Sequence, residues 1–429
     1  MIVLLIGSGG RENALAHSIS KSKSLTKLYI SPGNPGTEKL GENLDLNLSN
    51  HDEVISFCKK NRIELVVIGP EKYLVEGLGD SLRKERIKVF GPNSNAAEIE
   101  GSKVFSKDFM RKYNIPTADF KEFSSIEADE AKDYLKEQKY PCVIKADGLA
   151  AGKGVIICNS YKEAGEAIDS MFSDKLFGNA GNKIVIEEFM EGEEASIFAI
   201  TDGKDYICLP SAQDHKRIGD NDTGKNTGGM GAYSPAPVVT ESVLNETEKN
   251  IIQPVLAGMA EIGREFSGCL YCGIMVTKTG VKVVEFNCRF GDPETQAVLP
   301  LLEGDFLKLL CSASEGKLNK TSVKYNGGAS VCVVAASKGY PDKYFTGYEI
   351  TGIDEIASPE ILITHAGTKR EGKRVLTSGG RVLGITAVIQ TPDLKSAKDT
   401  AYKAINTINF EGMYYRKDIS DKANKYLKS

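Results

Sequence analysis

The stretch IVLLIGSGGRENALAHSI, residues 2–19, begins with an apolar run at 2–6, continues with the glycine turn at 7–10 and ends in a helical pattern at 12–19. This order predicts a buried strand that leads through a tight turn into a helix. Further apolar runs at 27–30, 65–68 and 89–90 end in the turns PGNPG, GPE and GPN. Strands that alternate with helices and end in such turns predict a doubly wound parallel sheet with a ligand crevice along the turns.

The whole chain of 429 residues is long enough for about three domains. After residue 101 the pattern changes to a charged helical segment at 103–113, followed by mixed strands and helices with long glycine-rich connections. From residue 325 onward, apolar strands are expected at 329–336 and 381–388. We predict an α/β and α+β multidomain protein with domains at 1–101, 102–325 and 326–429, the last a small α/β domain.

Composition narrows the class of protein. Hydrophobic residues make up 41% of the chain and charged residues 26%, which excludes fibrous and disordered proteins. A formal net charge of −4 leaves no polycationic surface, so we expect no nucleic-acid partner. No apolar run approaches the ~18 residues of a membrane span, and residues 1–6 lack the basic leader of a signal peptide. We therefore expect a cytoplasmic protein with no membrane partner.

The nine cysteines are too few for a disulfide framework, and their odd number fits reduced thiols. Cys269 and Cys272 form a CxxC motif, but a zinc or redox site would need further ligands, and the chain holds four histidines and no second CxxC. We predict buried, unreactive thiols on a strand.

The glycine turn GSGGRE at residues 7–12 partly matches the dinucleotide fingerprint GxGxxG, but Glu12 occupies the third glycine position. The second strand also ends without an acidic residue for a ribose hydroxyl, which weakens the prediction of a nicotinamide cofactor. Backbone amides at the start of the helix would still hold a simpler phosphate. A purely structural turn is the remaining alternative.

A second glycine-rich segment, VIKADGLAAGKGV at residues 143–155, places Lys145 on an apolar strand and Lys153 within the turn. It lacks the GxxxxGK[ST] spacing of a P-loop and therefore the hydroxyl that a P-loop offers to magnesium. A glycine hairpin that folds over a triphosphate would offset the negative charge of the phosphates in another way. Many loops of this composition are only mobile turns.

Two acidic segments follow. In IVIEEFMEGEEAS, residues 184–196, Glu187 ends an apolar strand where it can meet an adenine edge, and Glu194 is near enough for ribose hydroxyls; a solvated acidic face is the alternative. In KVVEFNCRFGDPET, residues 282–295, Glu285 and Asn287 are two apart on a strand and share a face with Arg289. Two oxygen ligands side by side suit magnesium, whose remaining positions go to phosphates and water.

These four segments, in this order, resemble the ATP-grasp superfamily, and the fuller sequence resembles its phosphoribosylamine–glycine ligase family. The strings that carry the resemblance run from residue 7 to residue 383. The most specific is QDHKRIGDNDTGKNTGGMGAYSPAP at residues 213–237, because ATP-grasp relatives with other substrates lack it. The others are GSGGRE, SPGNPGT, GPE, EGSK, KADGLAAGKGV, IEEFMEGEEAS, EFNCRFGDPETQ, HAGT and GGRVL.

The resemblance implies a fold and a reaction. The first domain would be the sheet that precedes the ATP-grasp domain, and the second would be the ATP-grasp domain with a glycine-rich lid at about 117–190. The enzyme would join glycine to 5-phosphoribosylamine through a glycyl phosphate, splitting ATP with Mg²⁺ or Mn²⁺, in the second step of de novo purine synthesis. A monomer is expected, with small-molecule substrates only.

The resemblance also implies roles for individual residues. The nucleotide would be bound by Lys103, Lys145, Gly152, Lys153, Gly154, Glu187, Phe189, Met190 and Glu194. The metal ligands would be Glu285 and Asn287, and the catalytic residues Asp214, Lys216, Arg289 and Asp292. Phosphoribosylamine would lie across Gly9, Gly10, Gly33, Asn34 and Glu71, with Gly9 and Gly10 at its phosphate.

One position departs from the wider superfamily, many of whose members carry an acidic metal ligand twelve residues before the glutamate, where this chain has Gly273. This puts a second magnesium held entirely by protein ligands in doubt. Three rival functions are a ligase or carboxylase of the same superfamily with another substrate, a nucleotide-dependent oxidoreductase and a catalytically inactive ATP-binding regulator. The loop at 213–237 disfavours the first, Glu12 the second, and the intact lysines and metal ligands the third.

Overall fold

The first strand, β1 (Ile2–Gly7), is the centre of a parallel sheet in the computed structural model of the chain, which describes residues 1–148, 154–173 and 182–426. The sheet has the order β3-β2-β1-β4-β5, so the predicted doubly wound topology is confirmed. Side chains at 3–6 are fully buried, as expected of a strand covered on both faces. The other strands are β2 (Lys27–Pro32), β3 (Glu42–Asn43), β4 (Leu65–Ile68) and β5 (Lys88–Phe90).

Helices connect these strands and continue into the next domain. Ser102 caps the helix that begins with Lys103, because its hydroxyl accepts the Phe105 N–H at 3.0 Å. The helices of this region are α1 (Gly10–Ser20), α2 (His51–Lys60), α3 (Glu71–Val75), α4 (Leu78–Lys84), α5 (Ser94–Gly101) and α6 (Lys103–Lys112).

A separate antiparallel sheet of order β6-β9-β7-β8 lies within the range predicted for the lid. It packs against two helices around a hydrophobic core of its own, which includes Phe123, Leu135, Ile144, Ile168 and Ile186. The elements are β6 (Phe120–Ser124), α7 (Ala128–Leu135), β7 (Cys142–Ala146), β8 (Val155–Cys158), α8 (Tyr161–Ser173) and β9 (Lys183–Glu188).

The central antiparallel sheet has the order β11-β10-β16-β17. Its core joins that of the N-terminal sheet, since Phe198 and Phe290 belong to the same buried cluster as Leu5. The elements of this part are β10 (Glu193–Thr201), β11 (Tyr206–Cys208), α9 (Glu241–Thr247), the π-helix η4 (Glu248–Ile252), α10 (Gln253–Glu261), β16 (Gly268–Thr277), β17 (Gly280–Asn287), α11 (Glu294–Val298) and α12 (Phe306–Ser314).

The third large sheet joins the C-terminal strands to the segment 213–234. Its path is β12-β15-β20-β24-β21, and β25 pairs with β20, so the sheet crosses the boundary expected at 325. The predicted strands at 329–336 and 381–388 are confirmed. The elements are β12 (Gln213–Asp214), β15 (Gly231–Ser234), β20 (Ala329–Ser337), β21 (Ile361–His365), β24 (Arg381–Ile389), α13 (Leu394–Ile405) and β25 (Met413–Tyr414).

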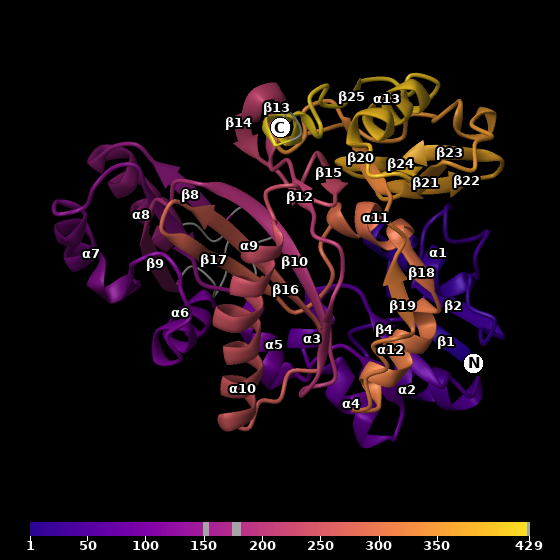
Figure 1. Ribbon diagram of the computed structural model, residues 1–429, viewed down its shortest axis with the longest axis horizontal. Helices are drawn as coiled ribbons and strands as arrows, with labels where there is room; N and C mark the ends of the chain where they lie inside the picture. Colours follow the sequence, from indigo (N-terminus) through magenta and orange to yellow (C-terminus); the bar gives the residue numbers. More distant parts are fainter. Residues whose placement is uncertain (149–153, 174–181, 427–429) are drawn as a thin grey trace.

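Short elements complete the described chain: β13 (Arg217–Gly219), β14 (Thr223–Asn226), β18 (Leu302–Gly304), β19 (Val323–Tyr325), β22 (Thr368–Glu371), β23 (Arg374–Thr377) and the 3-10 helices η1 (Ser125–Glu127), η3 (Asp220–Asp222), η5 (Leu299–Leu301), η6 (Ile353–Glu355) and η7 (Asp421–Lys425). Figure 1 shows the central sheet between the lid sheet on the left and the N-terminal and C-terminal sheets on the right. No helix within the described residues has the length and apolarity needed to cross a membrane.

Candidate active site

A cavity of about 1050 Å³ contains most of the predicted site residues, which come from the N-terminal, lid and central parts of the fold. Its lining includes Lys103, Lys145, Gly154, Glu187, Phe189, Met190, Glu194, Asp214, Lys216, Glu71, Glu285, Asn287, Arg289 and Asp292. Of the predicted residues that the structure describes, Gly9, Gly10, Gly33 and Asn34 are not in this lining. Gly152 and Lys153 lie outside the described residues.

Glu187, at a buried position of β9, contacts two lysines. Lys145 Nζ from β7 lies 3.0 Å from Oε1, and Lys107 Nζ from α6 lies 3.0 Å from Oε2. The side chains of Glu187, Lys107 and Lys145 are 2%, 3% and 8% exposed, so solvent screens these pairs little. Burial lowers the pKa of Lys107 to about 8, although Glu187 opposes this shift. The Glu187 carboxylate is therefore the counter-ion of the predicted nucleotide lysine Lys145.

Lys103 lies at the first turn of α6, beside the glycine-rich segment. Its Nζ donates a hydrogen bond to the Gly148 carbonyl at 3.0 Å. Asp147 fixes this junction, because it accepts the Ser102 hydroxyl at 3.0 Å and the Val104 N–H at 3.1 Å. Burial lowers the pKa of Lys103; Glu285 opposes the shift and Lys145 adds to it. Two lysines on one cavity wall favour an anionic ligand.

Phe189 and Met190 follow directly after β9 and line the same wall. Phe189 is 38% exposed, which is unusual for a phenylalanine and leaves its ring free to contact a ligand. Glu194 is the second residue of β10, on the far side of the turn at Gly192. The connection between β9 and β10 therefore presents an apolar surface next to a carboxylate, as a nucleoside would require.

Lys216, from the segment after β12, joins two of the predicted carboxylates. Its Nζ is 2.5 Å from Glu194 Oε2 and 4.0 Å from Glu285 Oε1. Burial raises the pKa of Asp214 to about 7, with Lys216 opposing and Glu294 and Glu194 adding to the shift. Asp214 can therefore exchange a proton near neutral pH. None of the roles predicted for the other site residues requires such an exchange.

Glu285 and Asn287 lie two apart on β17 and both line the cavity, so the predicted shared face is confirmed. Burial opposes ionisation of Glu285, but Lys216, Lys145 and Lys103 outweigh it and lower its pKa, which leaves a carboxylate. The Asn287 amide is assigned the orientation that satisfies both of its ends, in which its nitrogen donates to Glu100 Oε1 at 3.0 Å and its oxygen is left for another partner. A charged carboxylate beside an amide oxygen is a donor set that fits Mg²⁺.

Within the described ranges, no group of three or more His, Cys, Asp or Glu side chains could hold a metal ion without other ligands. Gly273 pairs with Glu285 across β16 and β17, and a Cβ at Gly273 would lie 3.2 Å from Glu285 Cγ. A larger side chain there would crowd Glu285. The donor set therefore suits a cation that takes its remaining oxygens from phosphates and water.

Arg289 connects the end of β17 to the N-terminal sheet. Its Nη2 is 2.8 Å from Glu100 Oε1, and its Nε donates to Glu71 Oε2 at 3.2 Å. Burial disfavours ionised Glu71, but Arg289 and Arg11 outweigh it and lower the Glu71 pKa. Glu71, at the start of α3, is thus a charged carboxylate in the cavity lining.

The N-terminal glycine turn is filled by the chain itself. Glu12 accepts the Gly9 N–H at 2.7 Å, and its carboxylate is 2.5 Å from Arg11 Nε. A Cβ at Gly7 would collide with Glu12, and one at Gly10 would lie 2.6 Å from Gln296 Nε2. The anion position at the start of α1 therefore holds Glu12, which explains why this residue replaces the third glycine of the fingerprint.

Asn34 uses its whole amide within the protein. Its nitrogen donates to the carbonyls of Ser8 and His365 at 2.8 Å each, and its oxygen accepts the N–H groups of Gly36 and Thr37. The residue joins the first and third domains. These contacts give Asn34 a structural role that the turn sequence alone did not reveal.

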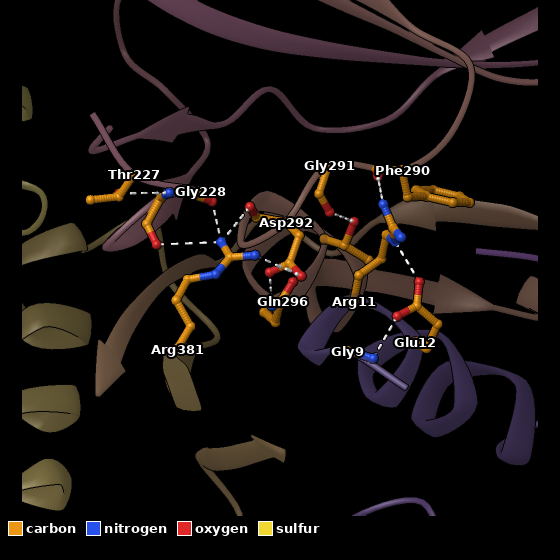
Figure 2. Close-up of polar contacts among 12 residues, drawn as sticks. Gly9, Arg11, Glu12, Thr227, Gly228, Phe290, Gly291, Asp292, Gln296 and Arg381 are labelled. Carbon is orange, nitrogen blue, oxygen red and sulfur yellow. Dashed lines mark hydrogen bonds and ion pairs between the residues drawn. The ribbon is translucent and has the colours of Figure 1, made fainter. Parts of the chain in front are cut away.

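Figure 2 shows a network that sequence analysis missed, in which Arg381 at the start of β24 reaches Asp292. Arg381 Nη2 lies 3.1 Å from Asp292 Oδ2. Lys107, Glu100 and the C-terminal Lys425 also line the cavity and were not predicted from the sequence. Lys425 lines the cavity and pairs with Glu193, whose Oε1 also accepts the Tyr426 hydroxyl at 2.5 Å. Only the GGRVL match pointed to Arg381, and no local pattern pointed to the rest.

Cys269 and Cys272 lie on β16 and are fully buried, so the prediction of buried strand thiols is confirmed. Burial raises the pKa of both thiols, which keeps them protonated and unreactive.

Family models of phosphoribosylglycinamide synthetase match the chain in three parts: the N domain at residues 1–100, the ATP-grasp (A) domain at 101–295 and the C domain at 330–422. The chain belongs to the phosphoribosylglycinamide synthetase family. The resemblance seen in the sequence is thereby confirmed, as are the three-domain architecture and the ATP-grasp fold.

Curated relatives span the whole chain. Phosphoribosylamine–glycine ligase of Clostridium acetobutylicum is 49% identical over 98% of this chain and 99% of its own length. The enzyme of the same name from Caldanaerobacter subterraneus subsp. tengcongensis is 46% identical over 98% and 99%. The crystal structure of phosphoribosylamine–glycine ligase from Thermotoga maritima has a TM-score of 0.84 at 34% identity and covers 98% of this chain and 100% of that one.

More distant structures share the fold alone. The biotin carboxylase domain of Hydrogenobacter thermophilus 2-oxoglutarate carboxylase has a TM-score of 0.73 at 17% identity, with 100% and 94% coverage. That protein was solved with MgADP, ADP and bicarbonate.

Proposed function

We propose that this chain joins glycine to 5-phosphoribosylamine, splitting ATP to ADP and phosphate and giving glycinamide ribonucleotide, in the second step of de novo purine synthesis. The observation that carries this proposal is one cavity that gathers the two lysines, the Glu285–Asn287 pair and the family-specific Asp214 and Lys216. Near-full-length identity to curated ligases supports the same reaction.

ATP would lie against the lid wall, with its phosphates near Lys103 and Lys145 and its adenine near Phe189 and Met190. Glu194 is suited to the ribose hydroxyls. Gly154 lines the cavity. Nucleotide binding by Gly152 and Lys153 stays a prediction, because both residues lie outside the ranges that the structure describes.

A divalent cation, Mg²⁺ in this proposal and Mn²⁺ as the substitute, would be held by Glu285 and Asn287. When bound, it would neutralise the charge of the β- and γ-phosphates. Support comes from the ionised state of Glu285 and from the oxygen-only donor pair. The cation would share its electrostatic task with Lys216, 4.0 Å from Glu285.

The first chemical step would activate glycine. A carboxylate is a poor electrophile, so a glycine oxygen attacks the γ-phosphorus, the bond to the β-phosphate oxygen breaks and ADP leaves. Arg289 and Lys216 are suited to stabilise the charge on the transferring group. The product, glycyl phosphate, has a carbonyl that an amine can attack.

In the second step the sugar amine attacks the glycyl carbonyl, phosphate leaves and the amine loses a proton. Asp214, with a pKa raised to about 7 by burial, is suited to take that proton. Glu71 is suited to orient the ribose or the amine. Asp292 is suited to contact the substrate. Substrate binding by Gly9, Gly10, Gly33 and Asn34 stays a prediction, as do the cytoplasmic location and the monomeric state.

Phosphate release from ATP and Mg²⁺ tests the proposal, with glycine and freshly made phosphoribosylamine supplied together and then each omitted. Release that needs both, with one glycinamide ribonucleotide formed for each phosphate, is the expected result. No release under any condition would contradict the proposal. Reduction of a nicotinamide cofactor or turnover with bicarbonate in place of glycine would favour one of the rival functions.

A further inference from the structure

Arg381 is the first residue of β24, and its guanidinium extends from the C-terminal sheet to the wall of the cavity (Figure 2). Its Nη1 donates to the carbonyl of Gly228 and, at 2.9 Å, to that of Asp292. Its Nη2 pairs with Asp292 Oδ2 at 3.1 Å. The side chain is 20% exposed, so one partly buried cation joins two segments that are more than sixty residues apart.

On one side of this junction, Asp292 follows the turn after β17, three residues beyond Arg289. Its second carboxylate oxygen accepts the Gln296 amide at 2.8 Å. Both oxygens of Asp292 are therefore engaged, and the carboxylate is held in one orientation. Burial favours the neutral form of Asp292, but Arg381 and Arg11 outweigh it and lower its pKa.

On the other side of this junction, the neighbouring residue Thr227 links Gly228 to Lys216. The Thr227 N–H and hydroxyl both donate to the Lys216 carbonyl, at 2.7 and 2.9 Å. The Gly228 N–H donates to the Tyr340 hydroxyl at 2.9 Å. The loop after Lys216 is thus fixed at its end, and Arg381 connects that end to Asp292.

The fit at this junction is close. A Cβ at Gly228 would lie 3.1 to 3.3 Å from three guanidinium atoms of Arg381, which is closer than ordinary contact. A planar guanidinium can donate to two carbonyls and a carboxylate at fixed angles, whereas a lysine ammonium is a point charge without that geometry.

We propose that Arg381 is a positioning residue for the ligation, which holds the loop carrying Asp214 and Lys216 at a fixed distance from the segment carrying Arg289. This rests on the proposed function. The wall with Lys103, Lys145 and Phe189 has no hydrogen bond or ion pair with Arg381 among the described residues. Loss of Arg381 is therefore expected to impair turnover and spare nucleotide binding.

The test compares Arg381→Gln and Arg381→Lys with the wild type, measuring kcat, the KM for phosphoribosylamine and the Kd for ADP. We expect kcat/KM for the amine to fall about 100-fold in both variants, the loss typical of a small misplacement of reacting groups. ADP should bind as in the wild type. Gly228→Ala, which keeps every charge and crowds the guanidinium, should lower the same constant and leave the Kd for ADP unchanged.

Arg370→Gln is the matched control, because Arg370 also pairs the third domain with another domain, in this case the first through Glu38 at 2.6 Å, and is not in the cavity lining. It should keep wild-type kinetics. Wild-type kcat/KM in Arg381→Gln, full activity in Arg381→Lys, or an equal loss of ADP binding would overturn the positioning role. A wild-type enzyme that forms no glycinamide ribonucleotide would instead refute the proposed function.

Discussion

Glu187→Gln removes the counter-ion of two buried lysines without changing the size of the side chain. In the wild type, Lys107 and Lys145 lie 3.0 Å from its carboxylate oxygens. At an effective dielectric constant of about 20, each pair at this distance gains about 5 kcal/mol of Coulomb energy. Removing one partner of a buried pair costs about 3–5 kcal/mol, because the other charge stays desolvated.

The pKa of Lys107 shows how much of this cost comes from a change of protonation. Burial already lowers it from 10.5 to about 8 with Glu187 present, so Lys107 without Glu187 should be neutral in the folded variant at pH 7.5. Keeping Lys107 neutral three pH units below its unfolded pKa costs about 4 kcal/mol, but the wild type already bears about 3 kcal/mol of this because its folded pKa is about 8. Lys107 protonation therefore adds about 1 kcal/mol, and we expect Glu187→Gln to lose about 3–5 kcal/mol of unfolding free energy in all, most of it because the buried lysines lose their counter-ion.

The pH dependence has a definite sign. In the wild type the folded pKa of Lys107, about 8, is below the unfolded value of 10.5, so this group makes stability rise with pH between about 8 and 10.5 and adds no slope below that window. The variant lowers the folded pKa further and extends the window downward. Between pH 6 and 8, the unfolding free energy of the variant should therefore rise with pH more steeply than that of the wild type. The difference in slope should be up to about 1.4 kcal/mol per pH unit.

Urea denaturation followed by far-ultraviolet circular dichroism measures this, since the chain has no tryptophan to report by fluorescence. Glu188→Gln is the matched control, because the neighbouring Glu188 pairs with Lys282 at 2.7 Å where both side chains are partly exposed. Such a pair contributes less than about 1 kcal/mol. Equal stability of the two variants, with no difference in pH slope, would refute the reasoning.

Three further changes test the site. Glu285→Ala should abolish turnover and remove the electron paramagnetic resonance signal of Mn²⁺ bound with ADP, while thermal unfolding stays near the wild type; near-normal turnover would reject the metal assignment. Glu71→Ala should raise the KM for phosphoribosylamine and leave ATP binding intact, and an unchanged dependence of rate on amine concentration would count against it. Because the pKa of Asp214 is raised to about 7, the wild-type rate should increase with pH through that value, and Asp214→Asn should lose this increase; persistence of the increase would assign it to another group.

Much of the fold follows from local pattern. The strands β1 and β4 agree with the predicted runs within one residue, because buried parallel strands are continuous apolar segments. The strands β3 and β12 have two residues each and leave no pattern. The pairing of β15 with β20 is a tertiary event, so the sequence could not show that the loop at 213–234 belongs to the C-terminal sheet.

The site residues also fall into two groups, those that a local sequence pattern predicts and those that only the fold brings to the site. Strand ends and glycine turns predict Lys145, Glu285 and Asn287 as site residues, because each lies in a local segment with an apolar flank. Lys107 looks like one of many lysines on a charged helix, and only folding places it against Glu187. Arg381 likewise gains its role from contacts with segments far away in the chain.

The glycine turn shows that residue type alone leaves the occupant of an anion position open. GSGGRE has the glycines of an anion site, and the structure uses them to accommodate Glu12. The carboxylate accepts the Gly9 N–H, a backbone donor that a phosphate at the start of the helix would also meet. Sequence alone could not decide between the two, since the deciding contact is made by a side chain within the motif.

Transfer of ¹⁸O from the glycine carboxylate to phosphate tests most directly whether the cavity activates glycine as an acyl phosphate. The enzyme is supplied with carboxylate-labelled glycine, ATP, Mg²⁺ and phosphoribosylamine, and the phosphate released is analysed by mass spectrometry. We predict one labelled oxygen in each phosphate, because the oxygen that attacks phosphorus leaves with it when the amide forms. Phosphate without label, formed together with glycinamide ribonucleotide, would contradict activation through glycyl phosphate.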